Sequence, residues 1–325
     1  MRHTTHVGVT RDSLIGESVM ARYRVPGTLI RSTHGYLAIP RTDGIKLFSA
    51  PSKMPGFSFG IPALGASDPR LGGSIATCPS AVTHVKRLGF NADTDAELAS
   101  EILALNGTAD VQALLDTPSV FDSICENCYA MSGMYRTPDV LRALLERLVW
   151  VFESLRDDAD AFVEYMVTAL MHQTRLHPYF RIHDSGDFYS PEYATAWLRI
   201  VERMHVLAPH VRFWAPVRGW HIARTLPVER AESATRILST IRDIAAVGNT
   251  TVRPSQLIAD LPAPTVSGLH AGTGVSTKGA YNCPSHETDN ECRDCRVCWD
   301  EPDRVVVYRG HAGLSSTAKI LPVLN

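Results

Sequence analysis

The stretch Tyr179-Phe180-Arg181-Ile182-His183-Asp184-Ser185-Gly186-Asp187-Phe188-Tyr189-Ser190-Pro191 decides how this chain folds. It begins with a short run, 179–183, that is typical of a strand, and passes into a polar loop with one glycine. Ser190 has the side chain of a helix N-cap, and Pro191 suits the first helical position. Apolar residues at helical spacing follow. The stretch therefore predicts a strand–loop–helix unit, the repeating unit of a parallel α/β sheet.

The same alternation extends along the chain in both directions. Further strands are expected at 57–63, 211–215, 250–253, 264–269 and 304–308, and helices at 138–155, 158–174 and 227–247. We predict a single α/β domain over residues 1–325, built as a TIM-like (β/α) barrel in complete, distorted or incomplete form. Three parts stand outside the repeat: an N-terminal arm at 1–50, a helical insertion at 80–122 and a cysteine-rich segment at 283–299.

Smaller features are expected within these parts. In the N-terminal arm, 13–23 has helical spacing, and short strands are expected at 28–30 and 37–39. Residues 68–73 are expected to form a loop that leads to the first cysteine. The helical insertion is expected to hold two helices, each opened by an aspartate in a capping position.

Composition and charge limit the classes of function. The chain has 325 residues, 45% hydrophobic and 20% charged, which is ordinary globular composition. Its formal net charge of −2 provides no overall basic field for nucleic acid. The N-terminus leads into no apolar signal sequence, and no window is long and apolar enough to cross a membrane. We therefore expect a cytoplasmic protein whose cysteines stay reduced.

The C-terminal segment holds four of the seven cysteines: Cys283, Cys292, Cys295 and Cys298. In a reduced protein, thiols at this spacing are typical of metal or redox sites. Zinc sites usually separate two CxxC pairs by a longer run, whereas here the last three cysteines form one compact run. This spacing is typical of iron–sulfur ligation, so we expect a 4Fe–4S cluster, with zinc as the alternative metal.

The other three cysteines are Cys78, Cys125 and Cys128. Three thiolates leave one iron of a four-iron cluster open to a ligand or substrate, by the logic that makes three-ligand zinc sites catalytic. Two arrangements stay open: two separate clusters, or one site that takes ligands from both groups. We expect both groups at the C-terminal ends of the strands, where parallel sheets place their sites.

His183, Asp184 and Asp187 directly follow a predicted strand. An imidazole and two carboxylates in one loop suit proton transfer or the binding of a polar ligand, so these are candidate catalytic residues. The alternative is ordinary turn chemistry, in which Asp187 caps backbone amides ahead of the helix.

Two later loops are candidates for cofactor binding. Arg218 follows the next strand and offers a cation to an anionic ligand. Gly272 and Gly274 lie in a glycine-rich loop of the kind that approaches phosphate closely, although its spacing differs from that of a P-loop. The alternative for each is a surface turn.

A resemblance to a known family is carried by several motifs jointly: 52–56, Cys78-Pro79, 125–130, 181–190 and the closing cysteine run. Together they resemble the gene-product-eighty-eight family of bacteriophage proteins. The Cys-x-x-Cys-Tyr-Ala step is also similar to radical-SAM-like phage proteins. That resemblance implies a TIM-like barrel, a four-iron cluster, S-adenosylmethionine as cofactor and the host cytoplasm as location. The chain departs from the radical-SAM pattern because a long segment separates Cys78 from Cys125.

These features support three functional hypotheses. The first is a phage iron–sulfur enzyme of radical-SAM-like descent, acting on an unidentified small-molecule or macromolecular substrate. The second is a non-catalytic iron–sulfur protein in redox sensing, electron transfer or host-factor binding. The third is a zinc-stabilised nucleic-acid-binding protein, which the mild net charge disfavours. The sequence does not indicate an oligomeric state.

Overall fold

The computed structural model describes most of the α/β repeat and part of the cysteine-rich segment. It covers residues 25–32, 35–40, 44–63, 65–77, 130, 133–217, 228–254, 257–258, 281–284, 288, 291–302, 304 and 306–309. Several predictions lie outside the described residues: the helix at 13–23, the helical insertion at 80–122, the strand at 264–269, and the candidate site residues Cys78, Cys125, Cys128, Arg218, Gly272 and Gly274.

A four-stranded parallel sheet forms the centre of the described structure. Its strands lie in the order β3 (Phe57–Phe59), β6 (Tyr179–Ile182), β7 (Arg212–Val217) and β8 (Thr250–Pro254). In the register, Phe57 pairs with Phe180, Phe180 with Phe213, and Phe213 with Thr250. Because neighbours in the sheet follow one another along the chain with helices between them, the predicted α/β class is confirmed. Closure into a barrel stays a prediction.

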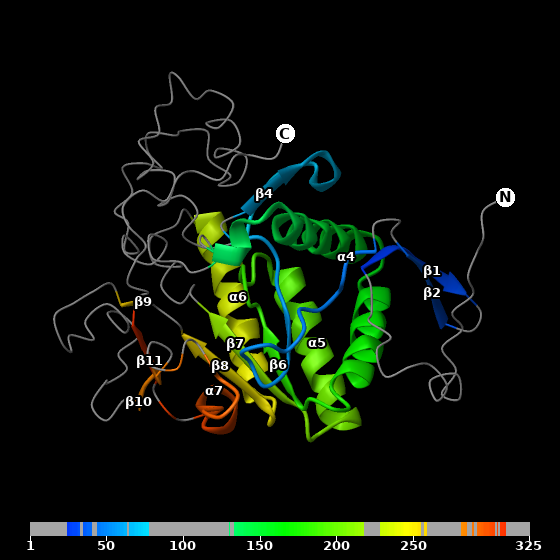
Figure 1. Ribbon diagram of the computed structural model, residues 1–325. Helices are drawn as coiled ribbons and strands as arrows, with labels where there is room; N and C mark the ends of the chain where they lie inside the picture. Colours follow the sequence, from blue (N-terminus) through cyan, green and yellow to red (C-terminus); the bar gives the residue numbers. More distant parts are fainter. Residues whose placement is uncertain are drawn as a thin grey trace, which may run out of the picture.

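Helix α4 (Pro138–Gln173) consists of two arms, which Figure 1 shows meeting at a sharp bend. The break falls at Asp158, whose φ of −160° and ψ of 90° are not helical. The Asp158 carboxylate accepts a hydrogen bond of 3.0 Å from the amide of Ala161, so it caps the second arm. The two arms correspond to the helices predicted at 138–155 and 158–174.

Helices α5 (Pro191–Leu207) and α6 (Val228–Ala246) follow the next two strands. Ser190 is the N-cap of α5, as predicted, since its hydroxyl accepts a 3.2 Å hydrogen bond from the amide of Tyr193. Trp197 and Ile200 belong to the buried stripe of this helix. Helices α4, α5 and α6 pack in succession, α5 between the other two.

The two faces of the central sheet differ in character. On one face, the rings of Phe59 and Phe180 pack against Trp197 of α5, with centroids 5.7 and 6.2 Å apart. Side chains alternate along a strand, so Ser58, Arg181 and Trp214, which pair in register, lie on the opposite face. We call this second side the Arg181 face. The helix layer therefore covers one face and leaves the Arg181 face for other segments.

Short strands surround this centre. β1 (Pro26–Ser32) and β2 (Gly35–Pro40) form an antiparallel hairpin, which includes the two strands predicted in the N-terminal arm. The arm also reaches the core, because Leu47 and Phe48 are buried. Parallel pairing joins β10 (Tyr281–Asn282), β11 (Val306–Arg309) and β9 (Leu257–Ile258). None of the helices in the described part of the chain has the length and apolar character that a membrane crossing requires.

The loop predicted at 68–73 is instead a hairpin. β4 (Gly65–Asp68) pairs with β5 (Gly73–Ala76), and a 3-10 turn, η1 (Pro69–Leu71), connects them. Asp68 caps the turn by accepting from the amide of Arg70, and Gly72 closes it with φ of +72°. The turn residues were visible in the sequence, but short strands of small residues carry no apolar alternation to predict them.

Candidate functional site

The C-terminal ends of β3 and β6 are joined through the polar loop 183–187. The amide of Asp184 donates to the carbonyl of Phe59 at 2.9 Å, and the amide of Ile61 donates to Ser185 at 3.1 Å. The Ser58 hydroxyl donates to the Asp184 carboxylate at 2.6 Å. These contacts continue the pairing of the two strands into the loop, so the loop is part of the folded core.

Two glycines allow this close approach. A Cβ atom at Gly60 would lie 1.8 Å from Asp184 Oδ1. At Gly186 it would lie 2.4 Å from Ile61 Cγ1, and the backbone there has φ of +75°, which favours glycine. The glycine predicted to give the loop its freedom is thus required by both conformation and space.

His183 lies in the core beneath helix α5. Its side chain is 1% exposed, its Nε2 is 2.8 Å from the Tyr193 hydroxyl, and the Phe188 ring packs 4.6 Å away. Burial, with a smaller effect of the Arg181 charge, lowers the pKa of His183 to about 3. The imidazole is therefore neutral near pH 7, and Nδ1 has no hydrogen-bond partner among the described residues. A catalytic role for His183 stays a prediction.

Asp184 shares the interior with a buried cation. Arg147 of α4 donates from Nε to the carbonyl of Lys46 at 3.0 Å and from Nη1 to Ser49 at 3.4 Å. Burial lowers the pKa of Arg147, and the nearby charges, Asp184 first among them, oppose that shift. The negative charge of Asp184 thus favours the ionised form of the buried Arg147 guanidinium, which is a structural use of Asp184.

Asp187 caps the backbone. Its carboxylate accepts a 2.7 Å hydrogen bond from the amide of Phe188, and the side chain is 3% exposed. This contact matches the capping alternative that the sequence left open. Asp184 and Asp187 are thus both placed in the loop as predicted, but the contacts described for them serve the fold; their catalytic role stays a prediction.

Residues that flank two of the N-terminal cysteines reach this same edge of the sheet. Thr77, directly before Cys78, is buried and its hydroxyl donates to the carbonyl of Pro62. Tyr135, seven positions after Cys128, donates from its hydroxyl to the carbonyl of Asp184 at 3.3 Å. Thr77 precedes the three-cysteine group in the sequence and Tyr135 follows it. Both are therefore fixed near the C-terminal ends of β3 and β6.

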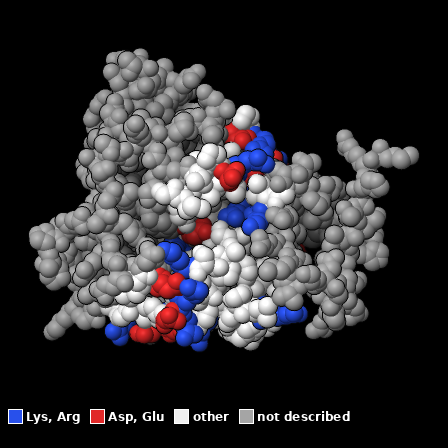
Figure 2. All heavy atoms as spheres, viewed as in Figure 1, with Lys and Arg blue, Asp and Glu red and all other residues white. Residues whose placement is uncertain are grey.

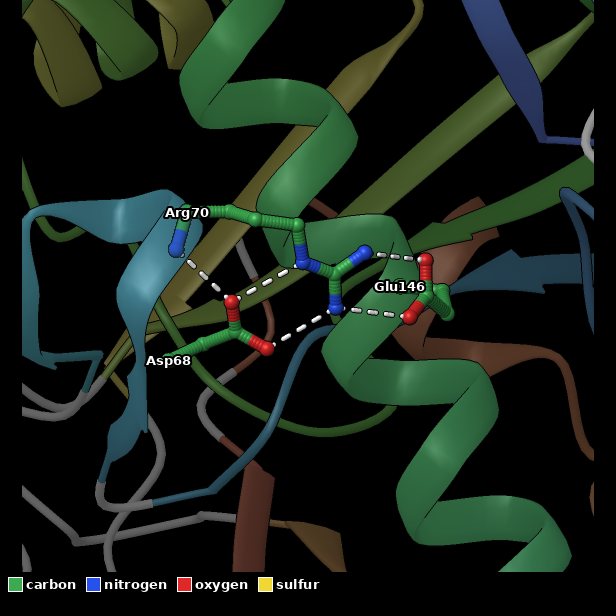
Figure 3. Close-up of polar contacts among 3 residues, drawn as sticks. All are labelled: Asp68, Arg70 and Glu146. Carbon is green, nitrogen blue, oxygen red and sulfur yellow. Dashed lines mark hydrogen bonds and ion pairs between the residues drawn. The ribbon is translucent and has the colours of Figure 1, made fainter. Parts of the chain in front are cut away.

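An ion-pair cluster fastens the β4–β5 hairpin to helix α4 (Figure 3). Arg70 donates to Asp68 with Nε at 2.9 Å and Nη2 at 2.8 Å, and to Glu146 with Nη1 at 3.0 Å and Nη2 at 2.8 Å. Hydrogen bonds to both carboxylates raise the pKa of Arg70. The sequence did not predict this cluster, because Arg70 and Glu146 are distant along the chain and no local pattern links them.

The C-terminal cysteine segment lies against the Arg181 face. The indole of Trp299, in the short helix α7 (Val297–Asp300), donates to the carbonyl of Phe180 at 3.1 Å and packs against the Trp214 ring, 4.9 Å away. The amide of Cys292 donates to the carbonyl of Lys53, just upstream of β3, at 2.7 Å. Figure 1 shows α7 beside the sheet, near β8.

This position differs from the prediction for the C-terminal cysteines. Trp299 contacts the second residue of β6 and lies near Thr251, the second residue of β8, and Asp300 lies 3.4 Å from Arg212 at the start of β7. These are the beginnings of the strands, not their ends. The physical reason is that an indole needs an apolar surface and a hydrogen-bond acceptor together, and Trp214 and the β6 backbone offer both here.

Four cysteines are described, Cys283, Cys292, Cys295 and Cys298; all are partly exposed, and none of them is in a disulfide. The Tyr281 hydroxyl lies 3.4 Å from Cys295 Sγ. Burial raises the pKa of Cys292 to about 11; Cys283 and Cys295 add to this, and Arg181 opposes it. The Cys283 and Cys295 thiols thus both lie close enough to Cys292 to affect its pKa. They suit a thiophilic metal chemically, although within the described residues no three ligand side chains already converge on one point.

The surface around α7 carries charges of both signs. In Figure 2, Lys and Arg side chains lie among Asp and Glu side chains in the described part of this face. Exposed ion pairs here include Arg293 with Glu291 at 2.5 Å and Arg304 with Glu301 at 3.5 Å. Such a mixture gives this described surface no single-sign field for steering a polyanion.

Fold and site together define an α/β protein with a parallel sheet, helices on one face, and a cysteine-rich segment against the other. The chain belongs to the gene product 88 family, whose model matches residues 39–301. This confirms the family resemblance that the motifs predicted; the radical-SAM resemblance stays a prediction. No curated protein matches the chain, and neither does any solved structure.

Proposed function

We propose that this protein binds an iron–sulfur cluster through Cys283, Cys292, Cys295 and Cys298. The observation that carries the proposal is the gathering of these four thiols in one segment that is anchored at two points: the Cys292 amide binds the Lys53 carbonyl, and the Trp299 indole binds strand β6. Their compact spacing favours iron–sulfur ligation over the usual zinc arrangements.

The chain's own residues would hold and shield such a group. Trp299, 3% exposed, fixes the position of Cys298 by docking on Trp214. Tyr281 offers its hydroxyl to the Cys295 sulfur, and hydrogen bonds to ligating sulfurs are a means by which proteins adjust such sites. When bound, a cluster supplies one-electron transfer.

The test is metal analysis of the full chain after anaerobic purification and reconstitution. We expect iron and acid-labile sulfide in cluster stoichiometry, and loss of both when the four cysteines are replaced by serine one at a time. Asp294→Asn is the matched control, because Asp294 lies in the same loop and is exposed. Stoichiometric zinc without sulfide would instead establish the zinc-stabilised alternative, with nucleic-acid binding as its functional test.

A finer proposal is a radical-SAM-like enzyme, with Cys78, Cys125 and Cys128 holding a reactive 4Fe–4S cluster and S-adenosylmethionine as cofactor. Its support is the sequential parallel order of β3, β6, β7 and β8, with the flanks of that cysteine group at the strand ends. Reduced, reconstituted protein is then expected to cleave S-adenosylmethionine to 5′-deoxyadenosine. Cys125→Ser removes the product; absence of cleavage in reconstituted wild type contradicts this version.

A non-catalytic role in redox sensing, electron transfer or host-factor binding is favoured by one observation. The polar residues expected to do acid–base chemistry, His183 and Asp187, are almost fully buried and engaged with neighbouring groups. Under this version the protein exchanges electrons reversibly in a redox titration and consumes no S-adenosylmethionine.

A further inference from the structure

Arg181 belongs to β6 and lies on the Arg181 face, where it pairs in register with Trp214 of β7. Its Nε donates to the carbonyl of His183, in the same strand region, at 3.1 Å, which orients the guanidinium. Its Cζ lies 4.6 Å from the centre of the Trp214 ring, and its Nη1 lies 3.8 Å from Met54 Sδ. The Arg181 guanidinium therefore has Trp214 and Met54 as neighbours.

Both neighbours lead directly to the cysteines. Met54 follows Lys53, whose carbonyl accepts the amide of Cys292 at 2.7 Å. The Trp214 ring packs against Trp299, which follows Cys298. These contacts place the Arg181 guanidinium against two residues, Met54 and Trp214, that adjoin the cysteine segment.

We infer that Arg181 is a positioning residue that sets the reduction potential of the group bound by Cys283, Cys292, Cys295 and Cys298. This inference rests on the proposed function. Uptake of one electron from an added reductant makes the site one charge more negative, and a partly buried cation stabilises the more negative form. Arg181 is expected to raise the midpoint potential without touching a reacting atom.

The experiment is a redox titration of cluster-loaded full chain with dithionite, followed by absorbance and electron paramagnetic resonance. Arg181→Gln and Arg181→Met both remove the charge and are expected to shift the midpoint potential to more negative values. Arg181→Lys keeps the charge on a shorter, more mobile head group and is expected to lie between them and wild type.

Arg156→Gln is the matched control. Its guanidinium also lies over a ring, 6.0 Å from the centre of Phe152, but it is exposed and belongs to helix α4. This variant is expected to keep the wild-type potential. Cluster content and thermal unfolding are measured for every variant, so that a misfolded protein is recognised before its potential is compared.

The outcomes separate this inference from the proposed function. Wild type that assembles no cluster overturns the proposed function and this inference with it. A loaded wild type whose potential is unchanged in both neutral variants overturns the inference alone. So does Arg181→Lys with the same shift as the neutral variants, because then the shape of arginine matters and its charge does not. Loading that fails in both neutral variants but survives in Arg181→Lys also overturns the inference, because the charge is then needed to assemble the group and not only to set its potential.

Discussion

The polar loop 183–187 and the cysteine-rich segment 283–299 both contact strand β6, yet they differ in the burial of their reactive groups. In the loop, His183, Asp184, Ser185 and Asp187 are between 1% and 5% exposed, and the loop backbone pairs with β3. In the segment, the cysteine side chains are partly exposed, and Trp299 is the buried anchor. The polar groups of the loop are buried in the core, whereas the thiols of the segment are partly exposed.

This difference teaches that a dense set of reactive side chains in a sequence does not by itself indicate chemistry. His183 and the two aspartates have the residue types of an acid–base site, but burial lowers the pKa of the imidazole, and the carboxylates accept hydrogen bonds from a hydroxyl and a backbone amide. The cysteine segment, whose thiols are partly exposed, therefore supports a function better than the buried polar loop.

The largest expected effect is at the anchor of the cysteine segment. Trp299→Ala removes a buried indole, and we expect the docking free energy of the segment to fall by about 3–5 kcal/mol. The measurement is hydrogen exchange over 291–300 together with iron content, both of which are expected to change while the central sheet stays protected. Trp299→Phe, which loses the hydrogen bond to Phe180, is expected to cost only about 1 kcal/mol.

If Trp299→Ala lowers protection from hydrogen exchange equally in β6, β7 and β8, the cysteine segment and the central sheet unfold as one cooperative unit. The segment is then not a separately docked part of the fold.

The next effect tests how tightly the polar loop is built. Gly186→Ala introduces a side chain at φ of +75° and within 2.4 Å of Ile61, so we expect about 2–4 kcal/mol lower free energy of unfolding. Gly72→Ala is the matched control, since Gly72 has φ of +72° but no described atom within 4 Å of its Cβ position. It is expected to cost about 1 kcal/mol, from backbone conformation alone.

Chemical denaturation of both glycine variants gives the two values. Equal losses at Gly186 and Gly72 would mean that the loop adapts to the extra methyl group, and that it is less rigid than its contacts with β3 indicate.

The third effect depends on pH. The folded-state pKa of His183 is about 3, below its ordinary value of 6.5, so between these values the unfolded chain binds a proton that the folded chain does not. The free energy of unfolding is therefore expected to decrease as pH falls from 6.5 towards 3, by up to about 1.4 kcal/mol per pH unit. Above pH 6.5 this contribution is constant.

His183→Asn isolates that contribution, because asparagine tolerates the positive φ of 63° at this position but does not titrate. Denaturation curves at several pH values are expected to show a shallower dependence in the variant. An identical slope in wild type and variant contradicts the assignment of a buried, neutral imidazole.

The smallest effect is expected at the rim, where the β4–β5 hairpin meets α4. Arg70→Met removes a partly exposed cation that bridges Asp68 and Glu146, and we expect a loss of about 1 kcal/mol, reduced by added salt. Arg156→Met breaks an ion pair with Asp157 in which both side chains are mostly exposed, and is expected to cost close to zero. A larger loss of stability in Arg156→Met than in Arg70→Met would contradict the expectation that partial burial strengthens the Arg70 ion pairs.

Much of the fold could be predicted because it depends on local features. Ser190, Pro191 and the apolar spacing after them define α5 within one stretch, and Asp158 marks the break in α4 in the same way. The hairpin at 65–76 and the Arg70 cluster could not be predicted, because they depend on pairing between residues far apart or on strands without alternation.

The candidate site likewise has some features that follow from the sequence and others that depend on tertiary packing. The identity of the candidate residues and the grouping of the four C-terminal cysteines follow from the sequence, and so does membership of the family. Their environments do not: the neutral state of His183 depends on α5 and Phe188 packing around it, and the link between Arg181 and the cysteines depends on Met54 and Trp214.

The sequence by itself therefore determined the α/β alternation, the caps and the clustering of thiols, since propensity, capping and spacing act over a few residues. Only the tertiary structure decided which face of the sheet the cysteine segment covers, and that it lies at the beginnings of the strands. It also decided which polar groups are sealed in the core. The reason is that burial and electrostatic interaction depend on which distant segments pack together, and spacing along the chain carries no record of that packing.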